Sequence, residues 1–280
     1  MRRKWFNILL IFTLIWLVLT PSLWAGQVIT QEVKLWAKKA LQQEKTLKTT
    51  TAPNTLVVLY FHNQTGWSKL DLLQKGLTLM LITDLSKIKE INILERVKMQ
   101  ALVEELGFGI SGLVKAKTFP RVGRLLGAQH LVGGDIVKGK MENFQLKSDL
   151  LKVSTERVFG QAMAEGKLLS ELFRMEKDLV FKIIKLLKIE LLSKERKELE
   201  KPLTTSTEAL FYFLQGIKHS DWGDFDKAKE SHVAALNEDP DFVLAAEAIQ
   251  EIESLSLEEK KACKSERNRL VRGLKRKLMR

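Results

Sequence analysis

The hydrophobic and polar positions between residues 54 and 96 change from a strand-like to a helix-like pattern and back. Leu56–Phe61 is an apolar run rich in β-branched and aromatic residues, typical of a strand buried on both faces. After the polar run His62–Gly66, apolar residues recur every three or four positions from Leu70 to Ile88, which predicts a helix. Ile91–Leu94 reads as a second short strand. This order predicts a βαβ unit with a right-handed crossover.

The pattern continues with further helices and strands up to residue 192. It predicts helices at 97–106, 117–126 and 168–192, and strands at 128–137, 144–153 and 157–166. The alternation slips within 144–153, which indicates a bulge there. Gly107 and Gly127 are expected to end the two shorter helices. The predicted fold class is α/β, a three-layer-like mixed sheet with flanking helices, parallel early and antiparallel late.

A different pattern begins at Ser206, where two helices are predicted within the period of a tetratricopeptide repeat, about 34 residues. Counting back from Pro240 places six residues at the positions of that motif: Tyr212, Gly216, His219, Ala228, His232 and Ala235. A third helix, from Phe242 to Ile252, is expected to cover the pair, because one repeat cannot bury its own apolar face. The sequence therefore predicts a small all-α helical hairpin after the α/β domain.

Residues 1–25 have the composition of a secretory signal peptide. A basic start is followed by the apolar run Ile8–Leu19 and by Ala25 before a plausible cleavage point. Export is expected, with an uncleaved anchor helix as the alternative. The single cysteine is Cys263, so no internal disulfide is expected, and residues 1–25 hold no cysteine for a lipid anchor.

These patterns divide the chain into five segments. They are a signal peptide (1–25), a helical segment and linker (26–53), an α/β domain (54–200), a helical hairpin with its covering helix (204–252), and a basic amphipathic tail (253–280).

The formal net charge of +12 is concentrated at the two ends of the chain. Residues 260–280 contain ten lysines and arginines and one acid, Glu266, with four apolar residues on one helical stripe. This pattern is typical of an amphipathic helix on an anionic surface, either lipid or an acidic partner; the alternative is a solvated tail. The candidate contacts are Arg269, Arg272, Lys275, Arg276, Lys277 and Arg280. An exported protein seldom meets nucleic acid, so none is expected as a partner.

Residues 54–192 resemble the CsgG-like domain of bacterial envelope proteins, a relative of the TolB amino-terminal domain and of FlgO. The motifs that carry this resemblance occur in order along the chain: Val57–Phe61 with Asn63, Leu73–Leu77, Met80–Leu85, Leu94–Arg96, Leu102–Gly107, Gly123–Ala128 and Leu131–Gly134. Many members of the family continue into tetratricopeptide repeats.

The resemblance implies a periplasmic protein, or one peripheral to the outer membrane, that helps secretion or assembly by binding other envelope proteins or itself. The alternative is a subunit of an oligomeric outer-membrane pore of the curli-exporter type, whose pore is built from long hairpins. The connections Lys138–Asn143 and Ser154–Glu156 are short, whereas a membrane strand needs about 9–11 residues, so the accessory role is favoured.

The chemistry of the sequence indicates no enzyme, cofactor or metal site. Gly107–Gly112 spells G-x-G-x-x-G, but it follows a predicted helix, whereas a dinucleotide site must follow a strand and open a helix. The four histidines lack metal-binding spacing. Catalysis by paired carboxylates is the open alternative, with Asp71 as a candidate.

The expected partner-contact residues are therefore loop and hairpin side chains. Trp67, in the polar loop after the first strand, either contacts a partner or folds back as a lid. The full set is Asn63, Trp67 and Gly76 near that loop and Tyr212, Phe213 and Phe225 on the hairpin.

Overall fold

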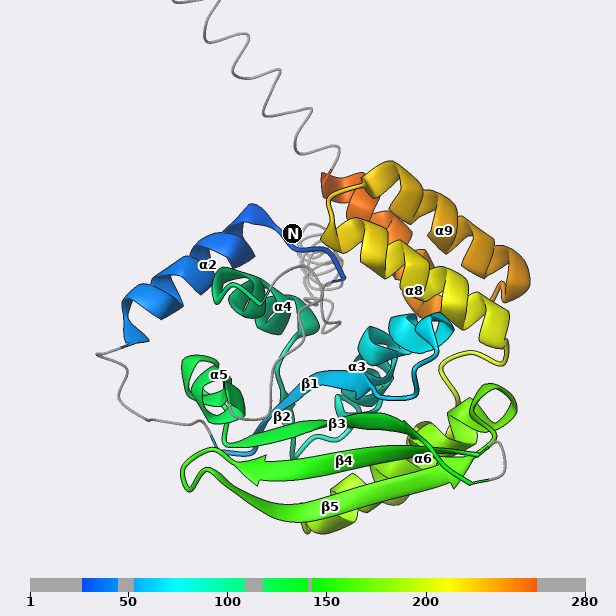
Figure 1. Ribbon diagram of the computed structural model, residues 1–280. Coiled ribbons are helices and arrows are strands. Elements are labelled where there is room, and N and C mark those ends of the chain that lie inside the picture. Colours follow the sequence, from blue (N-terminus) through cyan, green and yellow to red (C-terminus); the bar gives the residue numbers. More distant parts are fainter. Residues whose placement is uncertain (1–26, 45–52, 109–117, 141–142, 256–280) are drawn as a thin grey trace, which may run out of the picture.

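A five-stranded mixed sheet forms the centre of the molecule (Figure 1), with the strand order β2-β1-β3-β4-β5. The structure is a computed structural model, and it describes residues 27–44, 53–108, 118–140 and 143–255. β1 runs parallel to β2 and β3, and β3, β4 and β5 follow one another antiparallel. The strands are β1 (Thr55–Asn63), β2 (Asn92–Ile93), β3 (His130–Lys138), β4 (Phe144–Lys152) and β5 (Arg157–Gly166).

Helices cover both faces of this sheet. The helices are α2 (Gln31–Gln42), α3 (Asp71–Leu85), α4 (Arg96–Glu105), α5 (Phe119–Leu125), α6 (Leu168–Leu186), α7 (Ser193–Glu200), α8 (Thr207–Asp221) and α9 (Phe225–Glu238). A short 3₁₀ turn (Ser68–Leu70) precedes α3, and residues 243–255 are helical. α3 and α6 pack on one face and α4 and α5 on the other, with α2 outside α4. The predicted fold class, a three-layer mixed α/β sheet with an all-α part, is confirmed.

β1 supplies side chains to both apolar layers and contains one extra residue. Leu56, Val58 and Phe61 join the layer with α3 and α6, and Val57 joins the layer with α4 and α5. The register against β3 shifts between Val58 and Phe61. This bulge leaves two successive residues, Leu59 and Tyr60, in the α4 and α5 layer.

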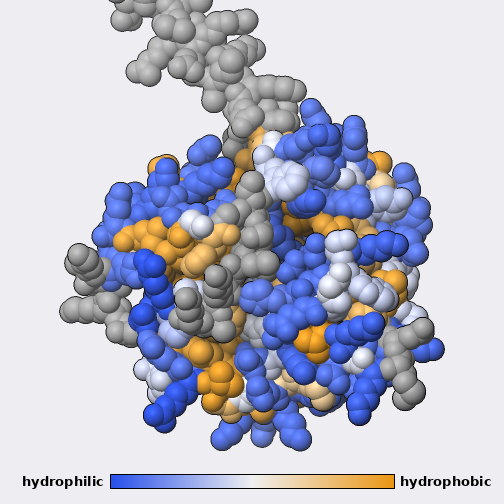
Figure 2. Space-filling model, in the orientation of Figure 1, coloured by the Kyte–Doolittle hydropathy of each residue, from blue (hydrophilic) through white to orange (hydrophobic). Residues whose placement is uncertain are grey.

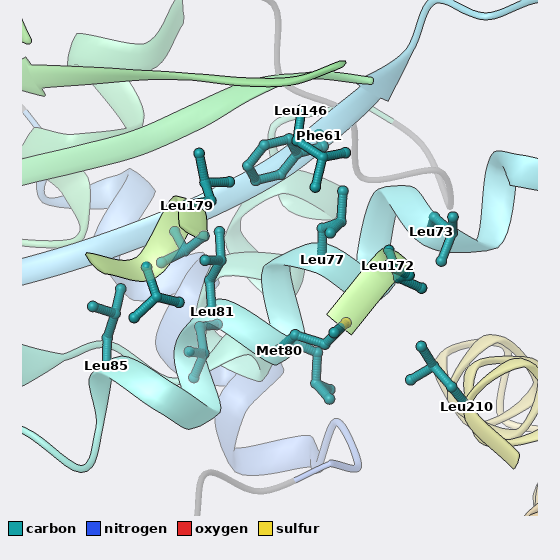
Figure 3. Close-up of a cluster of buried hydrophobic side chains, with 14 of the residues drawn as sticks. Phe61, Leu73, Leu77, Met80, Leu81, Leu85, Leu146, Leu172, Leu179 and Leu210 are labelled. Atoms are coloured by element: carbon teal, nitrogen blue, oxygen red, sulfur yellow. The ribbon is translucent and has the colours of Figure 1, made fainter. Parts of the chain in front are cut away.

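The larger core lies between the sheet and α3, α6 and α8. Figure 3 shows Leu77 and Leu81 of α3 beneath Phe61 and Leu146 of the sheet. Leu210 reaches into the same core from α8. Because one continuous core includes residues from the sheet and from the hairpin, the hairpin is packed onto the α/β domain rather than tethered to it.

Several helix ends follow from local sequence signals. Thr30 accepts a hydrogen bond from Val33 N at the start of α2, and Ser206 accepts one from Ala209 N at the start of α8. Gly107 and Gly127 follow α4 and α5 with φ of +80° and +66°, as predicted for helix-ending glycines.

One helix boundary and the position of one bulge differ from the prediction. The helix expected over 168–192 ends at Leu186, and Lys188 has a φ of +58°, a conformation that a helix cannot continue through. A separate helix, α7, then begins at Ser193. The predicted bulge lies where β4 pairs with β5, but the extra residue is Phe159 on β5 rather than a residue of β4.

The hairpin of α8 and α9 is closely packed around a histidine. A side chain at Gly216 on α8 would overlap the imidazole of His232 on α9, and the Phe213 and His232 ring centroids lie 5.2 Å apart. The segment 242–255 covers the pair, because Phe242 and Ala245 are buried in the shared core. The hairpin therefore forms as predicted, while its assignment as a tetratricopeptide repeat stays a prediction.

The surface shown in Figure 2 is mostly hydrophilic, with separate hydrophobic patches, one of them over α2. Within the described ranges, no helix has both the length and the apolar content to cross a membrane. The predicted signal peptide and most of the basic tail, including its six candidate contacts, lie outside the described residues.

A substitution at Gly134 on β3 can test how closely β3 and β4 approach each other. A Cβ at this position would overlap the backbone carbonyl of Lys147, which cannot move aside as a side chain can. We expect Gly134→Ala to lower the free energy of unfolding by about 3 kcal/mol or more. Gly76→Ala is the control, because its Cβ would meet only the flexible end of Leu214, at 2.5 Å. Equal urea midpoints for the two variants would contradict this account.

His232 gives the hairpin a dependence on pH. Burial lowers the pKa of His232 from 6.5 to about 4. The unfolded chain therefore binds the proton more readily, so this stability is complete above pH 6.5 and is lost as the pH falls toward 4. Relative to His232→Leu, the wild type should lose about 3 kcal/mol over that range. Urea unfolding of both proteins across the range measures it; parallel curves would contradict the prediction.

Candidate functional site

Asn63, at the end of β1, organises the loop that follows. Its Oδ1 accepts hydrogen bonds from Thr65 N at 3.1 Å and Thr65 Oγ1 at 2.6 Å. Its Nδ2 donates to Trp67 O at 2.8 Å and to Asp71 Oδ1 at 2.7 Å. With both ends of the amide in use, Asn63 shapes the loop; its expected role as a partner contact stays a prediction.

Trp67 is held by its neighbours and still 49% exposed. Its ring meets the Phe144 ring edge-on, with centroids 5.3 Å apart. Lys138 Nζ, from the end of β3, lies 5.9 Å from the Trp67 ring centroid. The tryptophan is thus fixed in place and partly open to solvent.

Trp67 stands at one side of a wide groove of about 1140 Å³. Its walls come from the loop before α3, the start of α6 and the outer face of α8. Residues that define this aromatic groove are Trp67, Leu72, Leu169, Phe211, Tyr212 and Lys218. The structure therefore brings together Trp67 and Tyr212, two of the predicted contact residues from distant parts of the chain.

A smaller recess of about 290 Å³ adjoins the aromatic groove. The two share Asp71, Leu72 and Lys218, so they lie next to each other on the surface. Trp222, in the recess, is 52% exposed, and Lys218 Nζ lies 4.8 Å from its ring centroid. The sequence prediction missed Trp222, although an aromatic residue directly before the turn at Gly223 is a signal that could have found it.

Three other predicted contact residues do not reach the groove. Gly76 is buried on α3 against Leu214, and Phe213 is fully buried between His232 and Phe242. Both are packing residues, so their prediction as contacts was wrong. Phe225 is half-buried in a separate cluster with Val28, Ala228 and Ile252.

A buried charge pair joins the hairpin to the α/β domain behind the recess. Arg96, at the start of α4, donates to both oxygens of Asp221 at the end of α8, each at 3.0 Å. Lys75 Nζ of α3 lies 2.7 Å from the same carboxylate. The side chains of Arg96 and Asp221 are only 2% and 0% exposed.

Neighbouring groups complete this charge pair. Arg96 also donates to Gln27 O at 2.8 Å and to the Tyr60 hydroxyl at 3.2 Å, and that hydroxyl donates to Gln100 Oε1. Burial acts to lower the pKa of Arg96, but the charges and hydrogen bonds of Asp221 and Tyr60 together outweigh it and raise that pKa. Burial raises the pKa of Tyr60 and lowers that of Lys75. Arg96 and Asp221 thus form a buried ion pair, with Lys75 at its edge.

A second buried charged cluster lies between α3 and α6, away from the aromatic groove. Lys177 and Lys87 contact the carboxylate of Asp84, which is 2% exposed. Burial, with the negative charge of Asp84 beside it, raises the pKa of Glu176 well above its ordinary value. The residues of this cluster do not line the groove, and they join α3 to α6.

The described residues hold no group of three or more histidine, cysteine, aspartate or glutamate side chains placed to bind a metal ion. His62 Nδ1 lies 3.6 Å from Asp135, and Asp135 also accepts from Gln64 Nε2 at 2.7 Å. Asp71, the carboxylate considered for catalysis, accepts the hydrogen bond from Asn63 and has a role in the loop. The groove offers aromatic and cationic side chains, which suit binding.

A family model described as "Curli production assembly/transport component CsgG" matches residues 37–143. This range is less than half of the chain and contains β1, α3, β2, α4, α5 and β3. It agrees with the CsgG part of the predicted resemblance; the TolB, FlgO and tetratricopeptide parts stay predictions. No curated protein sequence matches the chain.

Three solved structures show partial similarity. The LpoB C-terminal domain from Salmonella enterica is 18% identical, with a TM-score of 0.32, over 48% of this chain and 95% of that one. The same domain from Escherichia coli is 16% identical, with a TM-score of 0.34, over 47% and 97%. Lipoprotein GNA1162 from Neisseria meningitidis is 14% identical, with a TM-score of 0.28, over 50% and 100%. Similarities of this size carry no inference about a ligand or partner.

Because the Arg96–Asp221 pair is buried, we expect a large loss of stability when the charge of Asp221 is removed. Asp221→Asn keeps the shape but leaves the charges of Arg96 and Lys75 buried without their counter-ion. We expect the free energy of unfolding to fall by about 3–5 kcal/mol and the hairpin to become accessible to protease. Asp226→Asn, exposed on α9, is the matched control and should change it by less than about 0.5 kcal/mol. A similar urea midpoint for the two variants would show that the pair does not hold the hairpin.

Proposed function

We propose that this protein is an exported, non-catalytic accessory protein of the bacterial envelope that acts by docking other envelope proteins. The matched family is described as an assembly and transport component of curli production, which supports a role in assembly or secretion. The signal-peptide pattern of residues 1–25 supports a periplasmic location, free or at the periplasmic side of the outer membrane.

The observation that carries the proposal is the aromatic groove. Trp67 is 49% and Tyr212 38% exposed, and they line the same groove from different elements, the loop before α3 and α8. Tryptophan and tyrosine supply a large share of the binding energy at protein interfaces, where they fill pockets of the partner or form them. Two such residues in one depression suit a docking surface better than a catalytic centre.

The construction of the groove supports this role. Its walls belong to the α/β domain and to the hairpin, and the Arg96–Asp221 pair fixes these two parts relative to each other. A surface that is already in its binding shape loses less entropy when a partner docks. The α8 residues Leu210 and Leu214 are buried against the α/β domain, so this face of the hairpin is not open to a partner. The hairpin therefore contributes to docking through the outer face of α8, which forms part of the groove.

Photo-crosslinking in intact cells tests the proposal. With the photoreactive residue p-benzoylphenylalanine in place of Tyr212, irradiation should give a discrete adduct with an envelope protein, because the ring lies in the groove. Trp67→Ala in the same protein should reduce that adduct strongly, since loss of such an anchor costs about 2 kcal/mol, roughly 30-fold in affinity. Thermal unfolding of the Trp67→Ala protein checks that it remains folded.

The matched control carries the photoreactive residue at Val233, which is 42% exposed on α9 and outside the groove. Identical adducts from both positions, or none that depends on Trp67, would refute docking through the groove. An adduct between two copies of this chain would identify the partner as the protein itself.

A further inference from the structure

The size of the aromatic groove restricts what it can hold. Pockets for small molecules have volumes of about 300–1000 Å³ and enclose most of the ligand. The groove measures about 1140 Å³ and adjoins a recess of about 290 Å³. A depression of this volume suits several consecutive residues of a polypeptide better than a metabolite.

The apolar content of the groove is unusual for this surface. Among the described residues, eleven large hydrophobic side chains are exposed, and four of them line the groove or its recess: Trp67, Leu169, Tyr212 and Trp222. Two are tryptophans, the residue type most typical of binding anchors. The occupant should therefore present apolar or aromatic side chains at more than one position along its length.

The charged groups that stand over these aromatic rings are lysines. Lys218 and Lys138 stand over Trp222 and Trp67, and Lys69 lines the groove beside Trp67. Of the two acids in the lining, Asp71 already accepts a hydrogen bond from Asn63, and Glu208 lies in the first turn of α8, where the helix dipole favours a negative charge. Charge complementarity therefore favours carboxylates on the occupant.

The sheet offers little alternative for a partner that would add a strand. Along the outer strand β5, Lys182 Nζ donates to Met163 O at 2.5 Å, and Arg174 Nη2 donates to Glu165 O at 2.9 Å. These side chains occupy carbonyls that an added strand would need. The opposite edge strand, β2, is two residues long. Insertion of side chains into the groove is thus the better-supported way to bind.

We infer that the aromatic groove binds an acidic, amphipathic segment of a partner protein, with apolar side chains between its aromatic rings and carboxylates beside Lys69 and Lys218. This inference rests on the proposed docking function and adds the chemistry of the partner. The basic residues 260–280 of a second copy carry the same sign as these lysines, so they are disfavoured as occupants.

Synthetic peptides with a constant apolar pattern test the charge preference directly. In one series each charged position is glutamate, in a matched series it is lysine, and mixed peptides lie between. Binding of labelled peptides to the folded protein is followed by fluorescence anisotropy. The glutamate peptides should bind at least about tenfold more tightly than the lysine peptides, and added salt should reduce the difference. Equal binding of the two series, or tighter binding of the lysine series, overturns the inference.

Variants of the protein show whether the preference for glutamate peptides arises in the aromatic groove. Lys218→Glu should weaken the glutamate peptides and strengthen the lysine peptides, whereas Lys197→Glu, exposed on α7 away from the groove, should change neither. Tyr212→Ala should weaken both series. If the glutamate peptides do not bind while the Tyr212 crosslink forms, the partner chemistry is wrong and the docking function stands. If the crosslink also fails, the docking function itself is refuted.

Discussion

The contact between Arg96 and Asp221 is the interaction on which the arrangement of the molecule depends. Two opposite charges are removed from water here, at a joint where α4, α8, β1 and the segment before α2 meet. Such a pair tolerates little displacement, because a charge without its partner inside a protein is far more costly than a lost surface contact. Apolar packing between α3 and α8 holds the hairpin near the sheet, and the charge pair fixes the position it takes.

The aromatic groove is a consequence of that position. Its walls are formed by segments far apart in the sequence: the loop before α3, the start of α6 and α8. The loop wall is rigid because the hydrogen bonds of Asn63 define it, and the α8 wall is rigid because the buried side of that helix is part of the core. A binding surface built in this way depends on side chains that never touch the partner.

Much of the fold could be predicted from the sequence because the spacing of apolar residues indicates which side of a helix or strand is buried. Leu56–Phe61 and the apolar stripe along α3 could be recognised for this reason. Gly107 and Gly127 could be recognised as helix ends because glycine adopts the positive φ found there. The site was only partly predictable. Trp67 and Tyr212 were identified one by one as aromatic residues, but their proximity depends on how the hairpin packs, which periodicity does not encode. Gly76 and Phe213 show the reverse error, since a helix pattern alone cannot say which face a second domain covers.

The extra residue in β1 has a consequence for how this chain can vary through evolution. Because Leu59 and Tyr60 both face the layer of α4 and α5, Phe61 returns to the opposite layer, and the loop with Asn63 leaves the sheet in its observed direction. Exchanging one apolar side chain for another in this strand alters only local packing. Deleting or inserting a single codon would instead move the Tyr60 hydroxyl away from Arg96 and turn the loop around. The length of this strand is therefore more constrained than its composition.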